Sequence, residues 1–273
     1  MNQNIHMKVL VIGAGNMGLT YAEGMSTSKL LNNNIMVLDN SEDKLKELDE
    51  IPYFDACRDL KDCAPQADII FIAVKPFHAE SVFENLKPLT NKNQIIVSVM
   101  AGVTIAAMKK MSGLDKIVRA MPNLPAQIGK GLTSFVASSD VSEQETNDIE
   151  SLLSTTGKSL KVASENDIDA STGISGSGPA YVFFFMESMM KAALEMGFSN
   201  EDSRTLVTQT FAGAVELFNQ SDLTPKEWMD RVASKGGTTR AALNSMEANK
   251  VDVLIRDAAY AAFNRAIELG QEH

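Results

Sequence analysis

Two glycine-rich turns carry the residues of this chain that are best suited to chemistry. The first, Gly13–Gly18, has glycine at its first, third and sixth positions, a spacing typical of turns that hold the pyrophosphate of a dinucleotide. The second, Ser234–Arg240, places two glycines and two threonines at the start of a helical pattern, where backbone N–H groups can hold a small anion. One chain with both sites is typical of a redox enzyme that acts on a small acid.

The first turn has the surroundings that a dinucleotide-binding turn needs. It follows a strand-like run at 8–12, begins a helical pattern, and precedes the acidic residue Asp39 by about 20 residues. Glycines also serve plain turns, but all three conditions are met here. We expect Gly13 to make the tight turn, Gly15 to let the pyrophosphate approach the backbone, and Gly18 to let the helix pack on the strand.

Asp39 bears on the choice of cofactor. Its carboxylate can accept hydrogen bonds from the adenosine ribose hydroxyls, each contributing roughly 1.5–3 kcal/mol. The same charge repels a 2′-phosphate, Asn40 and Ser41 supply no arginine, and Lys44 compensates only in part. We therefore predict a preference for NADH over NADPH. The alternative is that Asp39 simply caps the next helix.

The remaining turns at strand ends suggest where the nicotinamide and the substrate bind. Backbone of Ala73–Pro76 can form a shelf for the nicotinamide, with the Lys75 ammonium near cofactor or substrate charge; the alternative is a solvated lysine. A third glycine-rich element, Thr172–Tyr181, either contacts the nicotinamide face or is a kinked start of a helix. Backbone N–H groups of Gly237–Thr239 can fork a carboxylate, with a dipole contribution of about 0.3–1 kcal/mol when exposed. The alternative there is a flexible loop with a threonine cap.

The histidines constrain the reaction. His6, His78 and His273 have neither metal-ligand spacing nor the partners of a Ser-His-Asp set, so we predict no metal and expect His78 at the surface. Ketone reduction needs a proton donor as the hydride arrives, and no strong side-chain acid is evident. A cyclic iminium, which has already taken its proton from water, has no such need.

The elements that position these turns alternate between strand and helix in the first part of the chain. Strands are predicted over 8–12, 35–38, 68–74, 94–99, 116–121, 132–137 and 159–162, with helices over 19–31 and 147–154 and a short helix that Ser41 caps. This alternation predicts an α/β fold, a Rossmann-like doubly wound sheet that is mostly parallel. Ligands then bind beyond the carboxyl ends of the strands.

Strand patterns stop near Ser164, and helices follow over 179–196, 201–220, 238–247 and 251–270, with Thr224-Pro225 beginning another. We predict a dinucleotide-binding domain over 1–163 and an all-helical dimerisation and substrate-binding domain over 164–273. Val182–Met186 are apolar on nearly all sides, which predicts a central helix buried on every side. Because the helical half is small, we expect a second subunit to cover part of it, giving a homodimer.

Composition excludes several classes of protein. The 273 residues are 44% hydrophobic, enough for a core, and the net charge of −10 disfavours nucleic acid and anionic membranes as partners. The apolar run Ile69–Val74 is too short to span a bilayer, and Met1–Met7 lacks a signal-peptide core. Cys57 and Cys63 form no CxxC motif, and we expect reduced, partly buried thiols. Together these features predict a cytoplasmic protein.

Taken together, six motifs resemble the pyrroline-5-carboxylate reductase family over nearly the whole chain. The first is shared by many dehydrogenases, whereas the last two together are specific to that family. They are Ile12–Gly18, Ala73–Pro76, Ala101–Thr104, Arg119–Asn123, Gly173–Tyr181 and Gly236–Thr239.

The resemblance implies NAD(P)H-dependent reduction of 1-pyrroline-5-carboxylate to L-proline, the last step of proline biosynthesis, by hydride transfer to the iminium carbon. It also implies a site where the sheet domain of one subunit meets the helical domain of its dimer partner, with dimers commonly assembled into decamers. Implied substrate-binding residues are Ser177, Ser234, Gly236, Gly237, Thr238 and Thr239, the last bonding the ring nitrogen as the catalytic residue. Implied cofactor-binding residues are Gly13, Gly15, Asn16, Met17, Gly18, Asp39, Ala73, Val74, Lys75, Pro76, Ala101 and Asn123.

Two departures from the family pattern stand out. Lys235 occupies a position where the family usually has proline, and Asp39 one where it often has a small polar or basic residue and prefers NADPH. Two other functions remain open. A β-hydroxyacid dehydrogenase would resemble its relatives in having a lysine and an asparagine on the helix that here begins Ala180–Phe185, which has neither. A non-catalytic dinucleotide-binding redox sensor is disfavoured by the intact second glycine turn.

Overall fold

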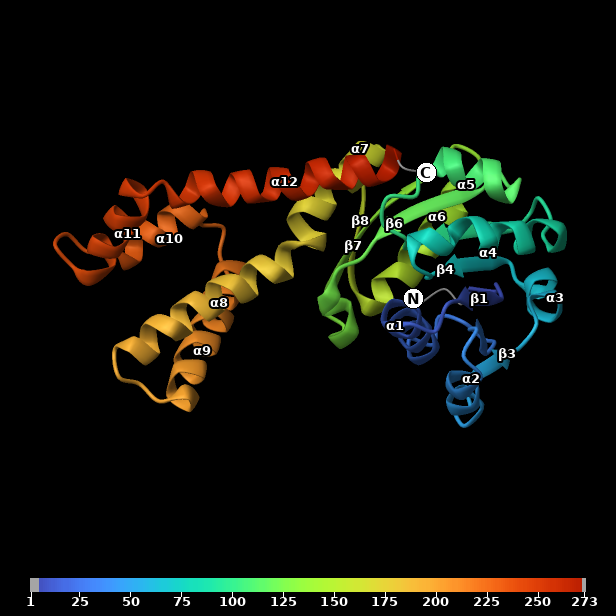
Figure 1. Cartoon of the computed structure of the whole chain (residues 1–273), viewed down its shortest axis with the longest axis horizontal. Coiled ribbons are helices and arrows are strands. Elements are labelled where there is room, and N and C mark those ends of the chain that lie inside the picture. The colour runs from blue at the N-terminus through green and yellow to red at the C-terminus, as the bar shows by residue number, and fades with distance from the viewer. Residues whose placement is uncertain (1–4, 272–273) are drawn as a thin grey trace. The chain divides into compact units, whose positions relative to one another are not determined.

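The computed structural model describes residues 5–271, which form two compact units (Figure 1). The first contains the described residues up to Ser177 together with those from Ala261 on, and the second is Gly178–Tyr260. Residues 1–4, which belong to the N-terminal segment Met1–Met7, lie outside the described part of the chain, and so does His273. The first unit is built on a sheet and the second is helical.

The sheet of the first unit has eight strands in the order β3-β2-β1-β4-β5-β6-β7-β8. Neighbouring strands are parallel except for β6 and β7, which are antiparallel. This confirms the doubly wound, mostly parallel sheet. The crossing connections diverge at β1, which places a ligand crevice beyond its carboxyl end. The strands are β1 Val9–Ile12, β2 Ile35–Leu38, β3 Phe54–Cys57, β4 Ile69–Ile72, β5 Ile95–Ser98, β6 Ile117–Met121, β7 Gly131–Ala137 and β8 Gly157–Lys161.

Strand β3 is the one that the sequence did not predict. It lies at the edge of the sheet, paired only with β2, and only Phe54 of its four residues is buried. An edge strand with an aspartate at its second position has neither the apolar run nor the β-branched residues that mark the central strands. Strand β3 matters for function because it brings Arg58 to the side of the sheet where the parallel strands have their carboxyl ends.

Helices cover both faces of the sheet. Along β1, Val9 and Val11 belong to one core with α1, α2 and α6, whereas Leu10 and Ile12 belong to a second core with α3, α4 and α5. Successive side chains of a strand point to opposite faces, so a strand buried on both sides has no polar face. The helices are α1 Asn16–Thr27, α2 Glu42–Asp49, α3 Leu60–Cys63, α4 Ala79–Leu86, α5 Ile105–Ser112, α6 Glu143–Leu153 and α7 Glu165–Ser171.

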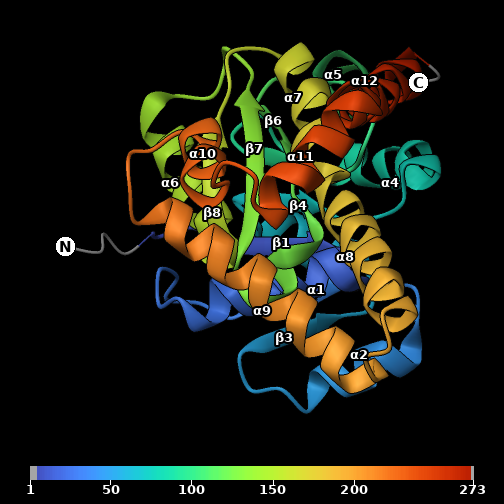
Figure 2. The same ribbon diagram turned by 90° about the vertical axis from the view of Figure 1, so that its left-hand side faces the viewer.

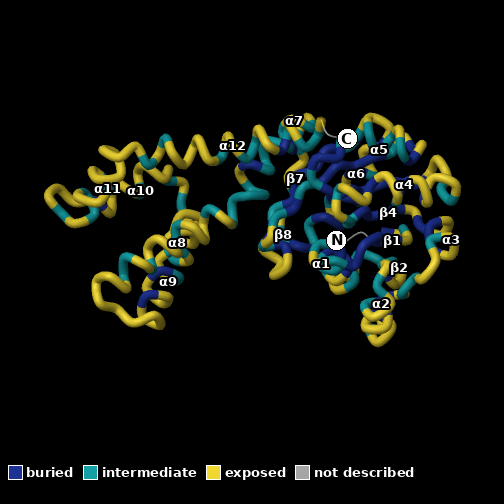
Figure 3. The backbone as a smooth tube through the Cα atoms, in the orientation of Figure 1, coloured by how far each residue is buried: buried dark blue, intermediate teal, exposed yellow. Residues whose placement is uncertain are grey.

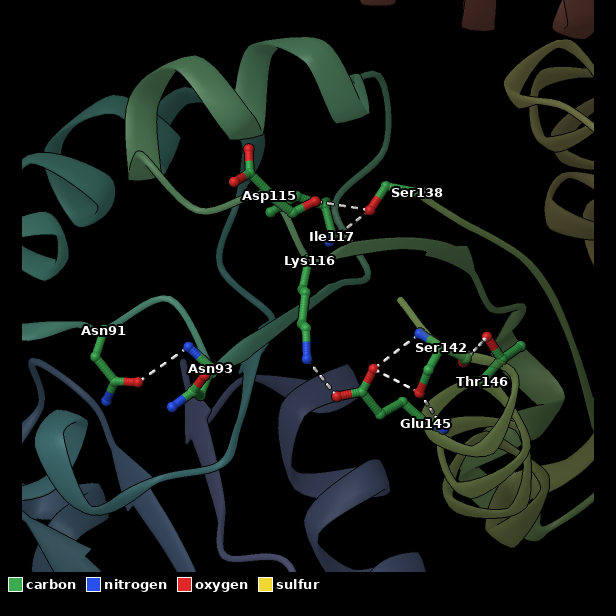
Figure 4. Close-up of polar contacts among 9 residues, drawn as sticks. All are labelled: Asn91, Asn93, Asp115, Lys116, Ile117, Ser138, Ser142, Glu145 and Thr146. Atoms are coloured by element: carbon green, nitrogen blue, oxygen red, sulfur yellow. Dashed lines mark hydrogen bonds and ion pairs between the residues drawn. The ribbon is translucent and has the colours of Figure 1, made fainter. Parts of the chain in front are cut away.

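The start of α6 is tied to the sheet by a partly buried ion pair (Figure 4). Lys116, just before β6, donates to Glu145 at 2.6 Å, and Glu145 also completes a capping box with Ser142. Burial alone would raise the pKa of Glu145, but the Lys116 and Ser142 donors outweigh it and lower that pKa. The carboxylate therefore stabilises the first unit while it is ionised.

The second unit consists of helices with few buried residues. A capping box at Thr224 begins α10 as predicted, and Gly197 follows α8 with a φ of 99°. The prediction that α8 is buried on every side is wrong for a single protomer, since none of its residues is buried. Within this unit α8 packs mainly on α9 and leaves its other faces open. The helices are α8 Gly178–Glu195, α9 Asn200–Asn219, α10 Pro225–Val232, α11 Thr238–Ala248 and α12 Val251–Gln271, whose last residues belong to the first unit.

Candidate functional site

A cavity of about 1080 Å³ lies in the first unit, beyond the carboxyl ends of β1, β2, β4 and β5. Ligand pockets typically enclose roughly 300–1000 Å³, so this one has room for a large ligand such as a dinucleotide. Most of the predicted cofactor-binding residues line it, namely Gly13, Gly15, Asn16, Met17, Asp39, Ala73, Val74, Lys75, Pro76 and Ala101. Gly18 and Asn123 are not among the lining residues.

The glycines of the first turn have separate structural tasks. Gly13 has a φ of 103°, and a Cβ there would lie 3.0 Å from the Ala73 carbonyl oxygen. Gly15 caps α1 without a side-chain hydrogen bond, and a Cβ on it would meet nothing within 4 Å. A Cβ on Gly18 would clash with the Gly13 carbonyl oxygen, so this glycine lets α1 begin tightly against the turn. The first N–H groups of α1 are thus presented at the cavity, an arrangement suited to a pyrophosphate.

Asp39 is held at the cavity wall by backbone donors. Its Oδ2 accepts from the Ala14 N–H at 2.7 Å and its Oδ1 from the Ser41 N–H at 2.9 Å, and Lys44 Nζ lies 3.5 Å from Oδ2. The cap of α2 is Ser41, which accepts from the Lys44 N–H, rather than Asp39. Oδ2 already accepts from two donors, but Oδ1 accepts from Ser41 and has a second lone pair, so the fixed Asp39 can still accept from a ribose hydroxyl.

The segment that follows β3 supplies lining residues that the sequence analysis missed. Arg58, Asp59, Leu60 and Lys61 all line the cavity. The Arg58 guanidinium is held by Asp49 at 2.6 Å and by Glu42 at 3.3 Å, both on α2. Recognising β3 would have placed Arg58 at the ligand edge, because the residue after a parallel strand lies there. Positive side chains therefore accompany Asp39 at this end of the cavity.

The turns after β4 and β5 line the same cavity. Lys75 is exposed and precedes the 3₁₀ turn η2, Pro76–His78, and His78 is exposed as expected, with its ring 4.3 Å from that of Phe77. Beyond β5, Gly102 has a φ of 76°, and a Cβ there would lie 2.9 Å from the Leu269 side chain. The last residues of α12 therefore pack onto the turn that contains Ala101.

The side-chain amide of Asn123 connects three segments of the first unit. Its Nδ2 donates to the Ser175 carbonyl oxygen at 3.2 Å and to Ser175 Oγ at 3.1 Å, and its Oδ1 accepts from the Leu132 N–H at 2.9 Å. The side chain thus joins the end of β6 to the π-helical turn Thr172–Gly176 and to β7. Ser177, predicted to bind substrate, directly follows that turn and is half-buried.

Arg119 forms a buried ionic cluster below the same turn. Its side chain is 3% exposed and pairs with Asp169 at 2.6 Å and with Glu165 at 3.1 Å. Glu165 also accepts the Ile105 N–H at 2.9 Å, at the start of α5. Arg119 Nε is buried without a hydrogen-bond partner among the described residues. The cluster fastens α7 to β6 and so positions the 172–177 segment. The motif Arg119–Asn123 did not indicate this role of Arg119.

The second glycine turn joins α10 to α11 in the helical unit. Gly236 has a φ of 74°, and the Gly237 N–H donates to the Ser234 carbonyl oxygen at 3.1 Å. Gly237 caps α11 without a side-chain hydrogen bond, and Thr238 and Thr239 are its first residues. The cap is therefore a glycine rather than a threonine. Because one amide is used inside the turn, an anion here would take the N–H groups that follow it.

No group of three or more His, Cys, Asp or Glu residues among 5–271 could hold a metal ion. No helix within that range is long and apolar enough to cross a membrane.

Comparison with known proteins decides the family. Residues 165–269 match the family model for pyrroline-5-carboxylate reductase dimerisation, and residues 8–102 match that for coenzyme F420-dependent NADP oxidoreductase. The chain is 34% identical over 267 residues to the pyrroline-5-carboxylate reductase of Pseudomonas aeruginosa, covering 97% of both chains. The chain belongs to the pyrroline-5-carboxylate reductase family. It is therefore an oxidoreductase.

Solved structures of reductases from this family have the same fold. The Coxiella burnetii enzyme matches with a TM-score of 0.90 at 33% identity, covering 97% of this chain and 99% of that one. The Plasmodium falciparum enzyme, solved with NADP bound, matches with a TM-score of 0.86 at 30% identity, covering 97% and 98%. Neither a β-hydroxyacid dehydrogenase nor a redox sensor is favoured by these matches.

Proposed function

We propose that this chain reduces 1-pyrroline-5-carboxylate to L-proline with a nicotinamide dinucleotide as hydride donor. The observation that carries the proposal is the cavity beyond β1, where the bare start of α1 and the fixed Asp39 carboxylate provide sites for a pyrophosphate and a ribose. Membership of the reductase family along the whole chain supports it, as does the NADP in the Plasmodium falciparum relative.

The chain's own residues would bind and orient both reactants. The α1 N–H groups take the pyrophosphate, Asp39 takes the ribose, and the Ala73–Pro76 backbone supports the nicotinamide. In the second turn, Ser234 and the backbone of Gly236–Thr239 take the substrate carboxylate, and the Thr239 hydroxyl bonds the ring nitrogen. The bound dinucleotide would supply a hydride from nicotinamide C4. The imine takes its proton from water before it is bound, so the protein need only align the reacting carbon, which supplies much of the rate.

The proposed organisation has a dinucleotide-binding domain over 1–163 and a substrate-binding and dimerisation domain over 164–273. The exposed apolar side chains of α8 support a homodimer through the helical unit, with Phe183 58% and Phe184 70% exposed. In the proposed dimer, the sheet domain of one protomer meets the second glycine turn of the other. We also propose that dimers assemble further, as in the decamers of the family. The proposed location is the cytoplasm.

NADH is the proposed preferred cofactor. The Asp39 carboxylate cannot turn away from a 2′-phosphate without losing the Ala14 and Ser41 donors. Lys44 and Arg58 offset the repulsion in part, but Arg58 is already paired with two carboxylates. We therefore expect NADPH to be accepted and NADH to be favoured.

Steady-state kinetics with pyrroline-5-carboxylate and each nicotinamide test the proposal. The expected result is turnover with both and a higher kcat/KM for NADH, and Asp39→Ser should lower kcat/KM for NADH about tenfold. Absence of turnover with both cofactors would overturn the function. A tenfold preference for NADPH would overturn only the cofactor assignment.

A further inference from the structure

The turn after β5, residues 99–104, lines the cavity on the side of β1 away from Asp39. Val99, Met100 and Ala101 are all lining residues. The sheet order places β2, which precedes Asp39, on one side of β1 and places β4 and β5 on the other. A dinucleotide whose pyrophosphate lies at the start of α1 and whose adenosine ribose lies at Asp39 therefore extends its nicotinamide towards the turn after β5.

Hydrogen bonds hold the two ends of this turn but not its middle. Before the middle, the Val99 N–H donates to the Ile72 carbonyl oxygen at 3.1 Å. After it, the Ile105 N–H donates to a carboxylate of α7 at 2.9 Å. Among the described residues, the backbone N–H groups of Ala101 and Gly102 have no hydrogen-bond partner. The position of the middle of the turn therefore depends on packing.

The end of α12 supplies that packing. Gly102 is buried and has a φ of 76°, a conformation that residues with a Cβ rarely adopt. A Cβ on Gly102 would lie 2.9 Å from the Cβ of Leu269 and 3.2 Å from the Leu269 carbonyl oxygen. A Cβ on Gly270 would lie 3.5 Å from the Gly102 carbonyl oxygen and 3.8 Å from Thr104 Cγ2. The turn and the helix thus approach so closely that no side chain fits at Gly102.

We propose that Leu269 and Gly270 are positioning residues for the nicotinamide half of the cofactor. Neither residue lines the cavity, and both act through Gly102 on the neighbouring Ala101, which does. The proposal rests on the proposed function for the identity of the ligand in the cavity. Helix α12 begins in the helical unit, and its residues from Ala261 on belong to the sheet unit. One helix therefore supports the cofactor turn and continues into the unit that is proposed to dimerise.

The effect of these residues should be confined to one half of the cofactor. At the other half, Asp39 is held by the Ala14 and Ser41 N–H groups, which do not depend on α12. A displaced turn would move the nicotinamide relative to the substrate, and a misplacement of about 1 Å can lower a rate roughly a hundredfold. Loss of the packing should therefore weaken binding of the nicotinamide and lower kcat, while the adenosine half binds as before.

The test compares NADH with 5′-ADP-ribose, which has the same adenosine and pyrophosphate but no nicotinamide. In the whole chain, Gly102→Ala forces the turn away from Leu269. Isothermal titration calorimetry should give a Kd for NADH that rises about tenfold and a Kd for 5′-ADP-ribose that stays within a factor of about two. In the reductase assay, kcat at saturating NADH should fall about tenfold as well.

A chain that ends at Ile267 tests the helix itself, because it lacks both positioning residues and keeps the buried Ala266. Its Kd for NADH should rise about fivefold, again with little change for 5′-ADP-ribose. A chain that ends at Gln271 is the matched control and should bind both ligands as the whole chain does. If the chain that ends at Ile267 does not fold, Gly270→Leu, which places a larger side chain between the helix and the turn, takes its place.

Two results would overturn the proposal. One is a loss of affinity for 5′-ADP-ribose as large as the loss for NADH, which would indicate general damage to the sheet unit. The other is an unchanged Kd for NADH in Gly102→Ala or in the shortened chain. Because both Kd values are measured without substrate, the expected difference between the ligands beside an absence of reductase turnover would count against the proposed function alone.

Discussion

The sheet unit and the helical unit bury their apolar residues in different ways. The sheet unit contains two cores, one on each face, and Phe71 and Phe83 are almost wholly buried in them. In Figure 3 the buried backbone is concentrated in this unit. In the helical unit, Gly178–Tyr260, only Ser203, Val207 and Ala233 are buried. Figure 2 shows α9, α10 and α11 of that unit as separate rods joined by loops. One unit completes its core within the chain, and the other does not.

The difference indicates what each unit requires for stability. In the helical unit, α8 alone exposes Val182, Phe183 and Phe184. Large exposed apolar patches are rare on monomeric proteins and mark interaction surfaces. The sheet unit should tolerate surface changes and depend on its buried ionic cluster. The helical unit should depend on a second copy of the chain.

The largest effect is expected from a charge on the open face of α8. Phe184→Glu places a carboxylate where the partner is proposed to pack, and an unpaired buried charge should weaken the dimer by about 3 kcal/mol or more, roughly a hundredfold in Kd. Light scattering at micromolar concentration should show monomers, and reductase activity should fall with the dimer.

Ile128→Glu is the matched control for that change. Ile128 belongs to the sheet unit and is 73% exposed, against 70% for Phe184. The same charge there should leave the dimer intact. If light scattering found the same fraction of dimer in Phe184→Glu and Ile128→Glu, the proposed dependence of the helical unit on a second copy would be contradicted.

The next largest effect is expected from Arg119→Met in the sheet unit. Removing the guanidinium leaves Glu165 and Asp169 without their cation, which should cost about 3 kcal/mol in the free energy of unfolding. Urea unfolding measures the loss. Lys109→Met, which breaks the more exposed pair with Asp140, should cost much less, because water and salt screen that pair. Similar losses in the free energy of unfolding for both variants would show that the buried cluster stabilises the unit no more than the exposed pair does.

Thr239→Ala probes the turn of the helical unit. Loss of the hydrogen bond to the ring nitrogen should lower kcat/KM by an amount equivalent to about 1–3 kcal/mol, with little change in NADH affinity. Thr210→Ala, on the exposed part of α9, removes a hydroxyl that bonds only within its own helix and should have no such effect. Unaltered turnover in Thr239→Ala would remove this residue from the mechanism.

The smallest effect concerns Glu145 and its pH dependence. Because Lys116 and Ser142 hold the folded pKa of Glu145 below its ordinary value of 4.5, the stabilisation is complete above that value and disappears as pH falls through the folded pKa. Lys116→Met should therefore cost about 1 kcal/mol at pH 7 and progressively less below about pH 4. The exposed Lys92→Met is the control. A cost for Lys116→Met that is independent of pH would contradict this account.

The sequence predicted the sheet unit better than the helical unit, for physical reasons. Central parallel strands such as Ile69–Ile72 are buried on both faces and therefore have continuous apolar runs. The edge strand Phe54–Cys57 has no such run, so Arg58 was not placed at the cavity. The apolar surface of α8 was recognised, but a pattern cannot tell burial within a chain from burial between chains. Likewise, nothing local marks Arg119 as the partner of two carboxylates on α7, far along the chain.

In the proposed dimer, each active site is completed by the sheet unit of one copy and the helical unit of another. Co-expression of Gly15→Val, which fits the extended backbone at Gly15 and blocks the pyrophosphate, with Thr239→Ala tests it most directly. Mixed dimers would contain one site with both defects and one with neither. The co-expressed pair should recover about a quarter of wild-type activity, because random pairing makes about half of the two-fold dimers mixed and each mixed dimer has one intact site. Activity no higher than the sum of the two variants alone would contradict it.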